Sequence, residues 1–179
     1  MPMTSKEWWD RTKASPATIV EWLEKQFHGE VTAADRIEHY CTSKAPSHWV
    51  ATLERIAADE RKHAGWIADL LAVRGVTAER REKNERYWSA VSTVDKSFEN
   101  VTAIASHAET MRLERIRVIA EDTSAPEDLR GTFARILRDE VFHEQSFRRM
   151  AGEKAMKSNA ALANEGRAAL GLINASEVL

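Results

Sequence analysis

Two short segments of the chain combine carboxylate and imidazole side chains at a spacing that suits metal binding. Residues 59–63 and 139–143 both read Asp-Glu-x-x-His, and the two copies lie eighty positions apart. On a helix, residues three positions apart share one face, so the Glu and the His of each copy can bind the same metal ion. Two copies of the pattern therefore suggest two metal ions.

The two segments belong to a longer internal repeat. Residues 53–63 and 133–143 share Arg-Ile-x-x-Asp-Glu-x-x-His, and residues 28–37 and 107–116 share His-x-Glu followed at the same offset by an acidic residue, Arg and Ile. Thirty positions separate Glu30 from Glu60, and thirty-one separate Glu109 from Glu140. The sequence therefore predicts two similar helical hairpins, one after the other.

Composition points to a single helical domain. The chain has 179 residues with 43% hydrophobic content, which is enough for one well-buried core. Gly and Pro are few, with seven and four residues, which is typical of a helical protein. The net charge of −2 gives no general electrostatic attraction to nucleic acid, so no nucleic-acid partner is expected.

Cysteine usage and hydropathy bear on the compartment. Cys41 is the only cysteine, so the sequence contains neither an intrachain disulfide nor a Cys-x-x-Cys metal site. The first nine residues do not read as a secretory signal, and no apolar run approaches the roughly 20 residues that span a bilayer. We therefore expect a cytoplasmic protein with no membrane partner.

Helical periodicity divides the chain into an N-terminal arm over 1–14, a bundle over 15–156 and a C-terminal tail over 157–179 that can hold a short helix. The arm is expected to be loose. Ser15 and Pro16 predict the start of a first helix that ends near Thr42. A second helix follows the break at 43–47 and stops at 74–75, a third runs from about 95 to 121, and a fourth from about 126 to about 152.

The charged segment between the second and third helices, residues 76–97, has two interpretations. It could begin a very long third helix, or it could be a partly helical crossover. We favour the crossover, because the chain must return along the bundle before Glu109 can lie beside Glu60, and about twenty residues suffice for that at roughly 1.5 to 3.3 Å each.

Each of the four predicted helices carries one glutamate in the middle of an apolar stripe, and two add a histidine. A buried carboxylate is costly, and four together repel one another. Two divalent cations resolve both problems, because four carboxylates balance their charge and two neutral imidazoles add nitrogen ligands. Oxygen and nitrogen ligands without a thiolate suit iron or manganese.

This arrangement resembles the ferritin-like di-iron carboxylate superfamily over roughly residues 15–150. Residues 27–30, Phe-His-Gly-Glu, and 59–64, Asp-Glu-Arg-Lys-His-Ala, are most similar to segments of rubrerythrin. The resemblance implies an all-α ferritin-like four-helix bundle of two similar hairpins joined by a long crossover, and a centre of two iron ions. It implies as ligands Glu30, Glu60, His63, Glu109, Glu140 and His143. By the same resemblance, Glu60 and Glu140 bridge the irons, while Asp59 and Asp139 orient the histidines.

Two departures from rubrerythrin stand out. Rubrerythrins typically carry a second glutamate three residues after the first on the third helix, and this chain has Arg112 there. Such an arginine can pair with a ligand carboxylate or narrow the substrate cavity. The rubredoxin-like iron module is also absent from the sequence, so electrons are expected to come from a separate donor.

Glu144 offers a seventh candidate ligand, because it lies four residues after Glu140 on the same helix. Its counterpart in the first repeat is Ala64, however, so a half-exposed helix position is an equally good interpretation.

The resemblance implies an oxidoreductase that activates O₂ or peroxide, either reducing it or oxygenating a small organic substrate that the sequence does not identify. Two other classes remain open: a ferritin-like protein that oxidises and stores iron, and a metal-free interaction bundle. The six tryptophans fit either the core or the surface of a homodimer.

Overall fold

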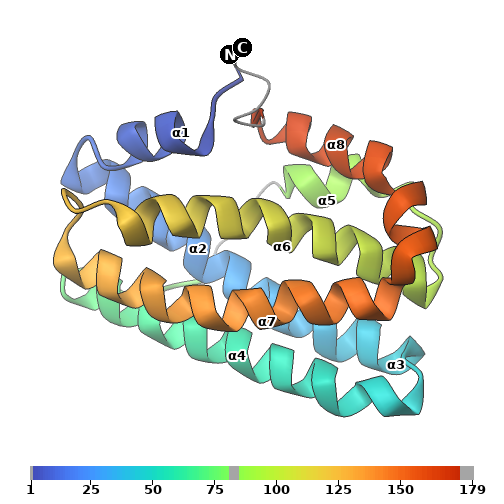
Figure 1. Ribbon diagram of the computed structural model, residues 1–179. Helices are drawn as coiled ribbons and strands as arrows, with labels where there is room; N and C mark the ends of the chain where they lie inside the picture. Colours follow the sequence, from blue (N-terminus) through green and yellow to red (C-terminus); the bar gives the residue numbers. More distant parts are fainter. Residues whose placement is uncertain (1, 81–84, 174–179) are drawn as a thin grey trace.

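The computed structural model describes residues 2–80 and 85–173, which form helices and no strands. The predicted all-α fold is confirmed. Four long helices, α2, α4, α6 and α7, make the bundle, and four shorter ones pack around it (Figure 1). In chain order the helices are α1 (Ser5–Thr12), α2 (Pro16–Arg36), α3 (Thr42–Lys44), α4 (Ser47–Ala72), α5 (Arg86–Ala90), α6 (Phe98–Glu121), α7 (Glu127–Ser158) and α8 (Ala160–Ala169).

The bundle consists of two helical hairpins, as the repeat predicts. The first pairs α2 with α4 and the second pairs α6 with α7, while α4 and α7 pack against each other and join the hairpins. In Figure 1, α7 runs between α6 and α4, and α2 passes behind. The crossover between α4 and α6 contains the short helix α5, and residues 81–84 of the crossover lie outside the described part.

Local signals explain where the helices begin and end. The Ser15 side chain accepts a hydrogen bond from the Thr18 amide at the start of α2, and Pro16 occupies the first turn. The predicted first helix continues beyond α2 through a π-helical turn, Ile37–Cys41, into α3. After α4, Gly75 has φ of 73°, a left-handed conformation that glycine adopts without steric cost.

Apolar side chains fill both ends of the bundle and leave its middle to polar groups. One cluster lies toward the α6–α7 turn and includes Trp22, Leu71 and Phe133. The other lies at the opposite end and includes Ile56, Phe147 and Met150. Glu60 lies between these clusters on α4, and Glu140 lies between them on α7. The two apolar ends therefore enclose the residues that the repeat places at mid-helix.

The expectation of a loose N-terminal arm is wrong for residues 5–12, which form α1. Thr4 and Glu7 make a reciprocal capping box at its start, and Trp9 is completely buried. The Trp9 ring lies edge-on to Trp22, with ring centroids 5.6 Å apart. The Thr-x-x-Glu spacing was the local signal for this helix, and the aromatic packing supplies the tertiary stabilisation that so short a helix requires.

The two ends of the described chain meet. Met3 donates a backbone hydrogen bond to the Gly171 carbonyl at 2.9 Å and accepts one from the Ile173 amide at 3.1 Å. The tail, for which the sequence predicts a short helix, contains α8, which packs on α5. Near the predicted end of the fourth helix, Gly152 has φ of 71°, but helical structure resumes and α7 ends only at Ser158. In the residues described, no helix is long and apolar enough to cross a membrane.

We expect Asp122→Asn to lower the free energy of unfolding by about 2 kcal/mol, the range of hydrogen bonds to charged groups. Asp122 accepts hydrogen bonds from Trp9 Nε1 at 2.8 Å and Lys13 Nζ at 2.5 Å, and so fastens α1 to the α6–α7 turn. Hydrogen bonds from Lys13, Ser124 and Trp9 hold the pKa of Asp122 well below its ordinary value of 3.8. Its contribution is therefore present above that value and is lost as the pH falls below it.

Urea unfolding near neutral pH, repeated at about pH 3, measures this effect, and the difference between wild type and variant should shrink at the lower pH. Asp10→Asn is the matched control, because Asp10 pairs with Lys6 and Lys13 on the exposed side of α1. Equal destabilisation by the two substitutions would show that Asp122 has no special role.

Candidate metal centre

Three of the long helices bring potential ligands together at the middle of the bundle. Glu30 on α2, Glu60 and His63 on α4, and Glu140 on α7 each offer a ligand atom, and these atoms all lie within 4.8 Å of one another. All four side chains have no exposed surface. The mid-helix glutamates predicted from the stripes of α2, α4 and α7 therefore do converge.

The two histidines face the same pair of carboxylates. His63 Nδ1 lies 3.7 Å from Glu60 Oε2 and 3.5 Å from Glu140 Oε1. His143 Nδ1 lies 3.3 Å from the other oxygen of each, Glu60 Oε1 and Glu140 Oε2. Each carboxylate thus directs one oxygen toward each histidine, which is the arrangement that a carboxylate bridging two ions requires.

The aspartates that precede these glutamates contact the histidines crosswise. Asp139 on α7 lies 3.1 Å from His63 Nε2 on α4, and Asp59 on α4 lies 3.5 Å from His143 Nε2 on α7. Because an ionised carboxylate only accepts hydrogen bonds, Nε2 of His63 must carry a proton, and Nδ1 is turned toward the glutamates. Lys62 lies between the two aspartates, 2.7 Å from Asp59 and 2.9 Å from Asp139.

We expect Asp139→Asn to weaken metal binding by about 10- to 100-fold, because removing a group that orients a histidine ligand typically costs this much. Asp59→Asn should have a smaller effect, since its contact with His143 is longer than that of Asp139 with His63. Competition for zinc with a chromophoric chelator measures both. Asp69→Asn, on the exposed surface of α4, is the control. A larger effect at Asp59 would contradict the ranking.

The two other glutamates considered as ligands, Glu109 and Glu144, differ in their surroundings. Glu109 on α6 interacts electrostatically with Glu60, Glu140 and His143, and its Oε2 is buried without a hydrogen-bond partner. It therefore faces the cluster, though outside the group of four. Glu144 instead accepts hydrogen bonds from Ser106 Oγ at 3.2 Å and Arg148 Nε at 2.8 Å. Its carboxylate is engaged between α6 and α7, which favours the interpretation of Glu144 as a helix position away from the ligands.

Arg112 on α6 contacts two of the candidate ligands directly. Its Nη2 donates a hydrogen bond to Glu30 Oε1, and its Nε lies 2.8 Å from Glu140 Oε1. Of the two effects considered for this arginine, pairing with a ligand carboxylate is the one that the structure shows. The guanidinium supplies a positive charge to the buried carboxylates.

Buried atoms without partners test whether the site suits a metal. Both oxygens of Glu60, both oxygens of Glu140 and Nδ1 of both histidines are buried and make no hydrogen bond. Buried polar atoms are rarely left in this way, and each costs free energy unless an ion or water satisfies it. These atoms are oxygen and imidazole donors that face a common centre, so they fit a pair of divalent cations.

Protons compensate charge in the metal-free cluster. Burial opposes a charge on His63, but contacts with Glu140, Glu30 and Glu60 raise its pKa to about 12. The pKa of His143 rises to about 11, since Glu140 and Glu60 outweigh burial. Burial raises the pKa of Glu30 to about 7 and, with help from Glu140 and Glu60, raises that of Glu109 well above its ordinary value. Without metal ions, the positive charges of the two protonated imidazoles therefore offset part of the negative charge of the glutamates.

A comparison with family models agrees with this geometry. The model described as rubrerythrin matches residues 21–151, which include all six predicted ligands. The chain belongs to the rubrerythrin family. No curated protein and no solved structure matches the chain. Family and geometry together indicate a site for two metal ions.

Two further parts of this rubrerythrin-family site were not predicted from the sequence. Arg55 on α4 stacks over Phe142 on α7 at 3.9 Å, and Arg135 on α7 stacks over Trp66 on α4 at 4.1 Å. The two arginines occupy equivalent positions of the repeat, so their recurrence was the available clue. Each covers an aromatic ring that lies beside a candidate ligand, His143 or His63.

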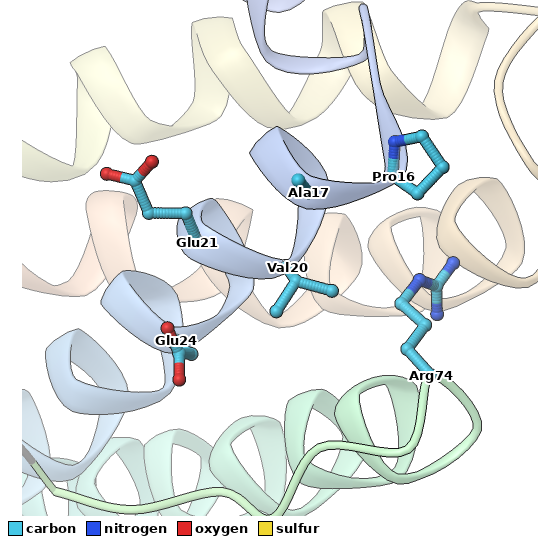
Figure 2. Close-up of a pocket in the computed structure, with 6 residues that line it drawn as sticks. All are labelled: Pro16, Ala17, Val20, Glu21, Glu24 and Arg74. Carbon is cyan, nitrogen blue, oxygen red and sulfur yellow. The ribbon is translucent and has the colours of Figure 1, made fainter.

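A surface hollow lies apart from the metal centre, between the start of α2 and the end of α4 (Figure 2). Its charged wall includes Arg74, which lies 2.8 Å from Asp128 and donates a hydrogen bond to the Leu70 carbonyl. Arg74 therefore already has partners within the protein. The hollow is lined by Pro16, Ala17, Val20, Glu21, Glu24 and Arg74.

Proposed function

We propose that this protein is a non-haem di-iron oxidoreductase that uses peroxide or dioxygen as its oxidant. The observation that supports this most directly is the placement of Glu60 and Glu140, each of which turns one oxygen toward each histidine inside an apolar bundle. Four carboxylates balance two divalent cations, and two imidazoles complete a set of oxygen and nitrogen ligands. The proposed ligands are Glu30, Glu60, His63, Glu109, Glu140 and His143.

Iron fits this ligand set and supplies the one-electron steps between an oxidant and an electron donor. Manganese has similar ligand preferences, so metal analysis must decide between the two. The residues of the chain provide the surroundings: the apolar clusters at both ends exclude water, and Asp59 and Asp139 hold the imidazoles in one orientation. Five of the proposed ligands, all except Glu109, are completely buried and would hold the ions in a fixed place.

Reduction of one H₂O₂ to two waters requires two electrons and two protons. The only cysteine, Cys41, is buried, and burial raises the pKa of its thiol to about 11. Cys41 is thus poorly suited to supply electrons, since the thiolate is the reactive form. We propose that a separate electron-donor protein supplies them.

The deciding experiment begins with metal-free protein and ferrous iron under anaerobic conditions. About two irons should bind per chain, and the double variant His63→Ala, His143→Ala should bind none stoichiometrically. Peroxide with a reductant, or ¹⁸O₂ with candidate organic substrates, is then added. Consumption of peroxide with the reductant indicates reduction, whereas ¹⁸O in an organic product indicates oxygenation.

Two other outcomes would contradict the proposal. Failure to bind iron or manganese in a fixed ratio would leave a metal-free bundle. Retention of many oxidised irons per chain in a large assembly would indicate storage. Size-exclusion chromatography of the iron-loaded protein separates storage from a monomer or homodimer with two irons.

A further inference from the structure

Arg112 contacts two proposed metal ligands that lie on two different helices. The α6 helix packs along α7, and α2 packs along α4, but α2 and α6 have little direct contact with each other. Arg112 reaches from α6 to Glu30 on α2 and to Glu140 on α7. About a fifth of its side chain, 21%, is exposed, whereas both carboxylates are completely buried. The arginine side chain is therefore the part of this contact that reaches solvent.

Arg112 changes the charge balance of the metal centre. The four glutamates carry four negative charges when ionised, which balance two divalent cations. Arg112 remains protonated at any physiological pH and adds one positive charge. Asp59, Asp139 and Lys62 also carry charge, but they pair with one another and with the histidines at Nε2, away from the arginine. The two ions would neutralise the four glutamates, so the guanidinium would keep no counter-charge among the ligands that it contacts, and a poorly solvated charge without a partner is costly. A bound monoanion gives it one.

The same ions would compete with Arg112 for its partners. Glu30 and Glu140, which the guanidinium contacts in this structure, are both proposed metal ligands. A guanidinium presents several N–H donors in a plane, and a carboxylate matches this geometry with two parallel hydrogen bonds. An exogenous carboxylate can thus pair with the guanidinium in place of the two side-chain carboxylates.

We propose that Arg112 gives the loaded metal centre a binding site for a small carboxylate, so that the substrate or an effector of this protein carries a carboxylate group. This inference rests on the proposed function, because it requires metal ions at Glu30 and Glu140. It assigns Arg112 to the selection of the ligand, which reaches the centre from the side where the arginine is exposed.

Cobalt(II)-loaded protein provides the test, because the visible spectrum of cobalt responds to a nearby anion and cobalt needs no oxidant. The cobalt content is counted first, and formate is then titrated at constant ionic strength. Wild type should show saturable binding, and Arg112→Gln should bind formate about 10- to 100-fold more weakly, as expected for loss of hydrogen bonds to a charged group. Acetate and benzoate then show how large a carboxylate the site admits.

Arg148→Gln is the matched control, since Arg148 is an exposed arginine that pairs with Glu144 instead of the cluster. It should bind formate as wild type does. If Arg112→Gln fails to fold by circular dichroism, Arg112→Lys decides, because it keeps the charge and loses the planar pair of donors. Formate affinity equal to that of wild type in the folded variant, or no formate binding by wild type that contains two cobalt ions, overturns the inference. Absence of bound cobalt overturns the proposed function itself.

Discussion

The overall constant for binding both metal ions should rise by at least about 100-fold for each pH unit between about pH 6 and about pH 8, or about tenfold per ion, because at least two protons must leave before the two ions bind. The pKa values of His63 and His143 are raised to about 12 and about 11, so both imidazoles are protonated in the metal-free protein across this range. A metal ligand must be neutral imidazole. Burial also raises the pKa of Glu109, which acts in the same direction. Since the metal-free state holds these protons, acid favours it.

Isothermal titration calorimetry with zinc, in buffers of different ionisation enthalpy, counts the protons released. The variant His63→Gln should release about one proton fewer than wild type, because the glutamine cannot be protonated. Substitution of the exposed His48 should leave the count unchanged. Binding without proton release would mean that the histidines are neutral before the metal arrives.

The repeat was sufficient to predict the bundle and the convergence of its mid-helix glutamates. A carboxylate at the centre of an apolar stripe must be buried once the helix packs, and two similar hairpins bury such positions at the same height. Glu30, Glu60 and Glu140 follow this logic. Glu109 follows it less closely, since it is only partly buried and lies outside the group of four, on a helix that has little contact with α2.

The crosswise contacts could not be predicted in the same way. The spacing of Asp59 and His63 places both on α4, and a local interpretation would pair them with each other. The structure pairs Asp59 with His143 and Asp139 with His63, across the contact between α4 and α7. How two helices pack against each other depends on side chains along their whole length, which no short motif records.

The N-terminal helix α1 shows a second limit of prediction from the sequence. Residues 4–7 carry a capping signal, but eight residues form a stable helix only when tertiary contacts support them. Here Trp9 supplies that support by packing on Trp22 and by donating a hydrogen bond to Asp122, which is 113 positions away. The local signal was present in the sequence, whereas the partner that makes it effective was not recognisable.

Replacement of Arg112 by leucine should have opposite effects on the metal-free and the metal-bound protein. Without metal, Glu30 and Glu140 lose the guanidinium that compensates them, and breaking a buried ion pair in this way typically costs about 3 to 5 kcal/mol. The melting temperature of the metal-free variant should therefore fall. Metal ions no longer compete with a fixed cation for these carboxylates, so zinc affinity should rise by at least about tenfold.

Thermal unfolding of the metal-free protein and chelator competition for zinc measure the two effects in one preparation. Arg148→Leu removes an exposed arginine from the same region and should change neither. A lower melting temperature together with a higher zinc affinity distinguishes this effect from poor folding, because a variant that merely folds poorly would lose both stability and metal affinity. Weaker zinc binding by Arg112→Leu would show that the arginine supports the ligands and does not compete with the metal ions for them.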